Sequence, residues 1–134
     1  MLQEIASTHR NNLAKSKRWF TDSNMDLFVW FKNKRPVSFQ LAYIKEQQEY
    51  SINWHINNGY THNLIKAELR HIKYRKSSIH SSECKFDTAF TARMFLLASN
   101  NIETTLADFI FARLMAYPGQ LEIHSNLAIV SVNL

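Results

Sequence analysis

The residues best suited to chemistry are the single cysteine and the six histidines. Cys84 follows His80 by four positions, and on a helix this spacing would bring an imidazole beside the thiol. A neighbouring imidazole stabilises the thiolate that a nucleophilic cysteine needs. Serines separate the two residues, and a lone cysteine is also a common small core or surface residue. The pair stays open between a nucleophile and a structural thiol, and we assign no catalytic residue.

A metal site is not indicated. His62, His71 and His80 recur at intervals of nine, which matches neither a helix face nor a strand, and no His/Cys cluster accompanies them. One cysteine excludes an intrachain disulfide and every Cys-cluster zinc site. Two glycines are too few for a glycine-rich phosphate loop. We therefore predict no metal and no cofactor, with the histidines at the surface or partly buried.

A polar trio offers a candidate ligand pocket. Gln40, Asn53 and His55 fall on the same face of a predicted sheet, with Gln40 expected opposite His55 and Asn53 two residues along. Polar groups that converge on an otherwise apolar sheet can orient a small ligand. The alternative is the solvent side of a meander, where strand alternation itself requires polar residues.

Basic charge offers a second candidate. The net charge is +5, and it gathers near the N-terminus, at Lys15, Lys17 and Arg18, and in one central segment. Such a field attracts phosphates, so binding of nucleic acid or another polyanion is one hypothesis, and a solvated basic face is the other. The central residues that would carry it are Lys66, Arg70, Lys73, Arg75 and Lys76.

The elements that position these residues include three clear strands. Residues 26–32, 37–45 and 50–56 are rich in β-branched and aromatic side chains and predict an antiparallel meander. We expect Trp30 opposite Phe39 and Leu41 opposite Trp54, which collects one aromatic face. That face would hold Phe28, Trp30, Phe39, Leu41, Tyr43, Ile52, Trp54 and Ile56.

Helices are predicted at both ends of the meander. Apolar residues at helical spacing over 2–17 predict an N-terminal helix, and 86–99 and 102–115 predict a helical hairpin, with Asp87 as an N-cap. Residues 64–75 fit a helix or a fourth strand equally well. The predicted fold class is α+β: an N-terminal helix, a three- or four-stranded antiparallel meander, and a C-terminal helical hairpin on one sheet face. Residues 1–118 form one domain, and 119–134 form a tail or an added hairpin.

Self-association is the leading functional hypothesis. The predicted strand over 26–32 is apolar on both faces, and its second face carries Leu27, Val29 and Phe31. These residues predict a buried patch between copies of the chain, with a dimer as the expected state. The apolar C-terminal tail is the alternative contact for self-association. The leading interpretation is therefore a small non-enzymatic binding or interaction domain; polyanion binding and a small-molecule pocket are the alternatives.

The expected cellular location depends on two features that the sequence lacks, a signal peptide and a membrane span. Residues 1–20 mix charged with apolar side chains and lack the apolar stretch of a signal peptide, and the longest apolar run, 27–31, is too short for a membrane span. We expect a cytoplasmic protein with no membrane partner.

Four short segments carry a resemblance. R-W-F at 18–20, D-L-F-V-W-F at 26–31, F-Q-L-A-Y at 39–43 and G-Y-T-H at 59–62 resemble the pattern R-W-F…F-D-L-x-V-W-F…F-Q-L-x-Y…G-[FY]-[ST]-H. A group of small uncharacterised bacterial proteins shares that pattern. Met25 stands where the pattern has its Phe. The similarity covers about residues 18–115 and implies a bacterial origin, but no activity.

Overall fold

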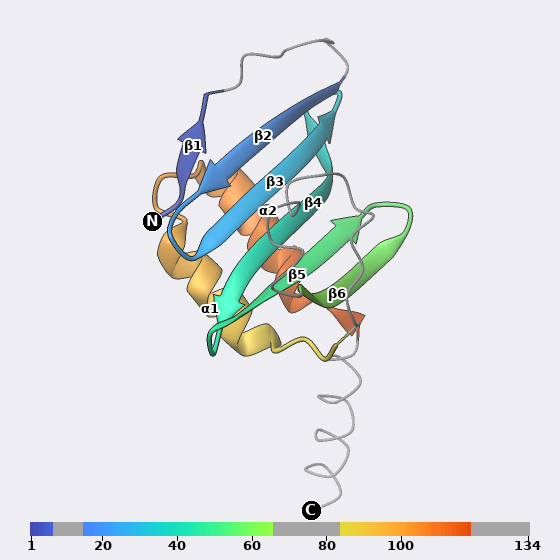
Figure 1. The fold of residues 1–134 in the computed structure, drawn as a ribbon. Coiled ribbons are helices and arrows are strands. Elements are labelled where there is room, and N and C mark those ends of the chain that lie inside the picture. Colours follow the sequence, from blue (N-terminus) through green and yellow to red (C-terminus); the bar gives the residue numbers. More distant parts are fainter. Residues whose placement is uncertain (7–14, 66–83, 119–134) are drawn as a thin grey trace, which may run out of the picture.

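A six-stranded antiparallel sheet with two helices against it forms the fold. The computed structural model describes residues 1–6, 15–65 and 84–118. The strands lie in the sheet in their chain order, and each pairs with the next (Figure 1). The strands are β1 (Gln3–Ile5), β2 (Lys15–Thr21), β3 (Met25–Lys32), β4 (Arg35–Lys45), β5 (Gln48–His55) and β6 (Gly59–Ile65). They are followed by α1 (Thr88–Ala98) and α2 (Thr104–Met115).

The predicted fold class is wrong in the size of the sheet, which has six strands rather than three or four, and at the N-terminus. Within the described residues no N-terminal helix is present: β1 and β2 occupy parts of the segment predicted as helical. Leu2 is fully buried, and its backbone N–H donates to the carbonyl oxygen of Ala98 at 2.9 Å. The helical spacing of apolar residues therefore did not identify a helix over 2–6 or 15–17, and residues 7–14 of that prediction lie outside the described residues. The alternation of β2 was hidden because Arg18 takes an inward position that a hydrophobic residue would normally fill.

Tight turns set the register of the central strands. Asn33 and Lys34 join β3 to β4, and Glu46 and Gln47 join β4 to β5; all four have positive φ. Two such residues between paired strands form a type I′ turn, which matches the twist of a hairpin. Only Asn33 belongs to the residue types that this turn prefers. The sequence therefore indicated longer loops, and the predicted pairing was displaced.

The error in the predicted pairing assigned the side chains of β3 to the wrong faces of the sheet. Val29, not Trp30, lies opposite Phe39, with an irregularity in the ladder between Trp30 and Phe31. A shift of one residue reverses every side chain of a strand, so Leu27 and Val29 face the helices, and Phe28 and Trp30 face away. Between β4 and β5 the error was two residues, because Phe39 rather than Leu41 lies opposite Trp54. An even shift leaves the faces unchanged.

The core lies between the sheet and the helices. Both helices lie on the same face of the sheet (Figure 1), and the Trp54 ring meets the ring of Phe109 edge-on at 5.4 Å. The buried hydrophobic residues of this layer come mainly from the four strands β2 to β5 and from both helices. The strand members that are fully buried or nearly so include Phe20, Leu27, Val29, Phe39, Leu41, Tyr43 and Ile52.

The helical hairpin is confirmed. Asp87 caps α1, because its carboxylate accepts the backbone N–H of Phe90 at 3.1 Å. On α1 the buried positions are Thr88, Thr91, Ala92 and Phe95, whereas Leu97 is 61% exposed. On α2 the buried positions are Leu106, Ala107, Ile110 and Leu114.

Two predicted features fall partly or wholly beyond the described residues. Strand β6 ends at Ile65, so the choice between helix and strand is answered for 64–65 and not for 66–75. The tail over 119–134 also lies outside the described part. In the described ranges no helix is long and apolar enough to cross a membrane.

Candidate functional site

The single cysteine does contact a histidine, but the histidine is His62. Its ring is buried on β6 under Phe86, with the two ring centres 4.9 Å apart. Cys84 donates its backbone N–H to the carbonyl oxygen of His62, and its Sγ lies 3.4 Å from His62 Nδ1. Twenty-two positions separate the two residues, so no local spacing could reveal the pair. His80, the predicted partner, lies outside the described residues.

Hydrogen bonds define the protonation of the His62 ring. Nδ1 lies 2.9 Å from the carbonyl oxygen of Cys84, which can only accept, so Nδ1 carries the proton. Nε2 then accepts the hydroxyl proton of Tyr43 at 2.6 Å. Burial lowers the pKa of His62 and raises the pKa of Tyr43, which keeps both groups neutral.

This arrangement is suited to structure rather than to nucleophilic catalysis. A general base must offer an unprotonated nitrogen to the thiol, but the nitrogen nearest Cys84 Sγ already holds a proton. The contacts instead attach the segment before α1 to the edge of β6. In the described part of the chain, no group of three or more His, Cys, Asp or Glu side chains could hold a metal ion.

The polar trio lies on the sheet face that points away from the helices, called here the helix-free face. Gln40 lies opposite Asn53, and His55 lies opposite Ser38, two residues along. The three side chains therefore share a face as predicted, although the pairing within the trio differs. All three are half-buried. Asn53 donates to the Thr61 hydroxyl at 3.3 Å, and His55 Nδ1 accepts the backbone N–H of Asn57 at 3.0 Å.

An aromatic row crosses the same face beside the trio. Trp19 on β2 stacks on Phe28 of β3 with ring centres 5.4 Å apart, and Phe28 lies 6.2 Å from Trp30. Lys17 Nζ lies over both Phe28 and Trp30, 4.6 and 5.3 Å from the ring centres. The Trp19 indole N–H donates to Asp26 at 3.1 Å. Phe28 is buried, and the two tryptophans are half-buried.

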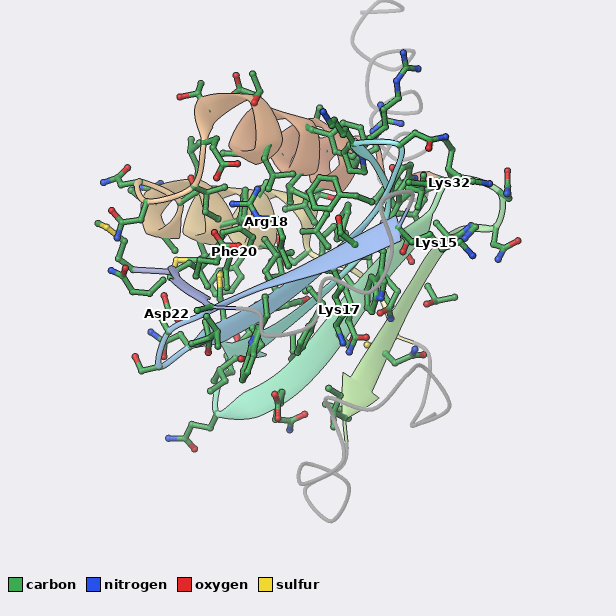
Figure 2. All side chains as sticks on the ribbon, turned by 90° about the horizontal axis from the view of Figure 1, so that it is seen from above. Lys15, Lys17, Arg18, Phe20, Asp22 and Lys32 are labelled. Atoms are coloured by element: carbon green, nitrogen blue, oxygen red, sulfur yellow. The ribbon has the colours of Figure 1, made fainter. Side chains whose placement is uncertain are left out.

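Cations gather at one end of this face. Lys15 lies directly opposite Lys32, and Lys32 lies opposite Arg35. Figure 2 shows Lys15 and Lys32 at one end of the sheet and Lys17 on the side away from the helices, whereas Arg18 and Phe20 point toward the helices. We call this cluster the basic corner; it consists of the exposed residues Lys15, Lys17, Lys32, Lys34 and Arg35.

The basic corner has no acidic counterpart within the described residues. The ion pairs among the described residues are formed by the N-terminal amino group, Arg18 and Lys45. None of them involves a cation of the basic corner. Like charges directly opposite on neighbouring strands destabilise a sheet. The Lys15–Lys32 pair therefore has an unfavourable interaction that an anionic ligand would relieve.

Arg18 differs from its neighbours in β2 because it is fully engaged. Its guanidinium binds both carboxylate oxygens of Glu4 and both of Glu103, at distances from 2.6 to 2.8 Å. The bonds to Arg18 lower the pKa of Glu103 to about 2. Arg18 thus connects β1, β2 and the start of α2, and it does not belong to the basic corner.

The residues predicted for self-association lie in the core. Leu27 and Val29 are fully buried between the sheet and the helices, and Phe31 packs partly buried against the same core. A partner at the surface therefore cannot contact Leu27 or Val29. The central basic residues, Lys66, Arg70, Lys73, Arg75 and Lys76, lie outside the described residues.

Sequence reasoning missed Lys32, Lys34 and Arg35 as site residues. Lys32 and Arg35 flank a two-residue turn that contains Lys34, and the register of that turn brings Lys32 opposite Arg35. The pairing of β2 with β3 brings Lys32 opposite Lys15. The signal that could have revealed them is the basic composition of residues 32–35 beside Asn33, a residue suited to a type I′ turn.

Comparison with known proteins gave no match: no protein-family model, no curated protein and no solved structure is significantly similar to this chain.

Proposed function

We propose that this protein is a non-enzymatic binding domain whose ligand surface is the helix-free face of β2 to β5. One observation carries the proposal: an aromatic row, a polar trio and a basic corner that forms no ion pair among the described residues share the face that neither α1 nor α2 covers. The opposite face is occupied by the core. Half-buried tryptophans beside amide groups supply both contact area and hydrogen bonds to a ligand.

The three tryptophans allow a direct test. Trp19 and Trp30 lie on the helix-free face, whereas Trp54 is 7% exposed under α2. Each indole N–H gives its own NMR signal, which Trp19→Phe, Trp30→Phe and Trp54→Phe would assign. We expect mixtures of oligonucleotides, oligosaccharides and peptides to include a ligand that shifts the Trp19 and Trp30 signals and leaves Trp54 in place. Shifts confined to Trp54, or none with any mixture, would contradict the proposal.

Self-association stays a separate prediction, as do a bacterial origin and a cytoplasmic location. Because Leu27 and Val29 are buried, a dimer would have to use other residues. Native mass spectrometry of the gently purified chain tests the predicted state. A dimer mass would support it, and a monomer at high concentration would exclude it.

A further inference from the structure

We infer that the basic corner and Trp30 bind the backbone and an unpaired base of single-stranded nucleic acid. This inference rests on the proposed function, because it names the ligand class of the helix-free face. Lys15, Lys17, Lys32 and Arg35 share that face by register, and all four are exposed. Cations on a common face beside an aromatic ring are the combination that binds a charged backbone and stacks a base.

The position of Lys17 links the charged and aromatic parts. Its ammonium lies 5.3 Å from the centre of the Trp30 ring, so a phosphate bound by Lys17 would place the adjoining base next to the indole. Trp30 is half-buried, so it offers a ring surface that its own strand already holds in place. Rigid aromatic groups lose little conformational freedom when they bind.

Single strands fit this surface better than a duplex. Duplex recognition generally places a helix or a β-ribbon in a groove, and the basic corner instead lies on the face of a sheet. Stacking on Trp30 also requires a base that is not paired within a helix. An anionic membrane fits less well. The exposed large hydrophobic side chains of the described residues include none from β2, β3 or the turn after β3, so the corner has no apolar group to insert into lipid.

Fluorescence anisotropy with a labelled twelve-nucleotide oligothymidylate tests the inference on the full chain. We expect binding that weakens with salt: about −0.7 in log–log slope per neutralised phosphate gives about −2.8 for four cations, or up to about 50-fold between 50 and 200 mM. The double variant Lys32→Glu with Arg35→Glu should weaken binding at least about tenfold and flatten the slope by about 0.7 for each cation removed.

Matched variants separate the specific contacts from net charge. Arg93 is exposed on α1, behind the sheet, so Arg93→Glu makes the same charge change as Arg35→Glu but should leave the affinity unchanged. Trp30→Ala should weaken binding by about 5- to 150-fold, and Trp30→Phe should restore most of the loss because it keeps a stacking ring. Circular dichroism of each variant confirms that the sheet is retained.

Several outcomes would overturn the inference. The first two are an unchanged affinity of the Lys32/Arg35 double variant for oligothymidylate and an equal loss of affinity with Arg93→Glu. The other two are binding to a duplex of the same length as tight as to the single strand, and binding only to vesicles of phosphatidylserine and phosphatidylcholine. A loss with Lys73→Glu and Arg75→Glu alone would move the site to the central basic segment. If oligothymidylate does not bind but another ligand shifts the Trp19 and Trp30 signals, the inference fails and the proposed function stands.

Discussion

The two faces of the sheet are built from the same strands but differ in almost every physical property. On the face under α1 and α2, one row across the sheet runs through Phe20, Leu27, Leu41, Ile52 and His62, all fully buried or nearly so. On the helix-free face, a neighbouring row runs through Trp19, Phe28, Gln40, Asn53 and Thr61 and is partly exposed. Alternation along each strand thus places the core on one face and leaves the other face partly exposed, where we propose that a ligand binds.

Polar groups also behave differently on the two faces. Under the helices, the side-chain nitrogens of His62 are both hydrogen-bonded, and its ring stacks with Tyr43 and Tyr50 at 5.9 and 5.5 Å. At the basic corner, exposed cations lie beside one another, and in the described part of the chain none of them forms an ion pair. A buried polar group generally needs a hydrogen-bond partner within the protein, whereas an exposed polar group can bind water or a ligand. The contrast shows that the repulsive Lys15–Lys32 contact lies at the exposed end of the helix-free face.

The largest effect should come from a matched pair of truncations. Phe39 is 1% exposed in the core, and Phe28 is 5% exposed on the helix-free face. We expect Phe39→Ala to lower the free energy of unfolding by about 3–5 kcal/mol because the helices cannot close the cavity. Phe28→Ala should cost less, because Lys17 and Trp30 can move into the space. Urea denaturation measures both, and equal losses would mean that the second face is also a core.

His62 should give the next largest effect. Replacing it by Phe leaves the Tyr43 hydroxyl and the Cys84 carbonyl without this partner and should cost about 1–3 kcal/mol. Because burial lowers the folded-state pKa of His62 below 6.5, its contribution is fully present above pH 6.5 and is lost as the pH falls toward the lowered pKa.

Urea midpoints at pH 5.5 and 7.5 test this dependence. The native chain should lose more stability on acidification than His62→Phe does. Parallel losses in the two proteins would show that other groups cause the pH dependence.

The Arg18 cluster should contribute a smaller, acid-sensitive amount. The pKa of Glu103 falls from 4.5 to about 2 in the folded chain, so its contribution is present above pH 4.5 and disappears as the pH falls through about 2. Because the Glu103 side chain is 53% exposed, solvent screening keeps the effect under about 1 kcal/mol. Thermal unfolding between pH 2 and 5 measures it. Glu103→Gln should remove this part of the pH dependence, and Asp108→Asn, on the same helix, should retain it.

The smallest change in stability should have the opposite sign. Lys32→Glu replaces a repulsive pair with Lys15 by an attractive one and should raise the free energy of unfolding by about 0.2–1 kcal/mol. The same change should weaken oligothymidylate binding. Lys85→Glu, at an exposed position before α1, is the control for charge alone. A loss of stability with Lys32→Glu would show that the two lysines do not repel each other in the folded protein.

The strands and the helical hairpin were predictable because their signals are local. Three β-rich segments and the cap at Asp87 are confirmed, since side-chain type and one capping bond decide them. The N-terminal strands were not predictable. Arg18 faces the helices because Glu4 and Glu103 neutralise it, and those carboxylates are 14 and 85 positions away. Because these distant carboxylates allow a charged residue on the inward side of β2, the sequence lacks the alternation of polar and apolar residues that identifies a strand.

The residues of the candidate site were likewise predicted correctly only in part. The trio of Gln40, Asn53 and His55 was grouped correctly because the register error between β4 and β5 was even. Between β3 and β4 the error was odd, so Leu27 and Val29 were expected at a surface and Trp30 in the core. Residues with positive φ that rarely adopt it, Lys34, Glu46 and Gln47, form tight turns that displace each predicted pairing by two residues. The irregularity between Trp30 and Phe31 then reduces the error between β3 and β4 to one residue, which is what exchanges the faces.

The amino-acid sequence by itself determined the meander, the helical pair and the basic balance of charge, because each depends on residue type and short-range spacing. Tertiary structure decided which face the helices cover, which histidine meets Cys84 and which cations come together. These outcomes depend on the register of tight turns and on contacts between residues far apart in the chain. A shift of one position between two strands exchanges the core face for the helix-free face, and no local pattern in this chain predicts that shift.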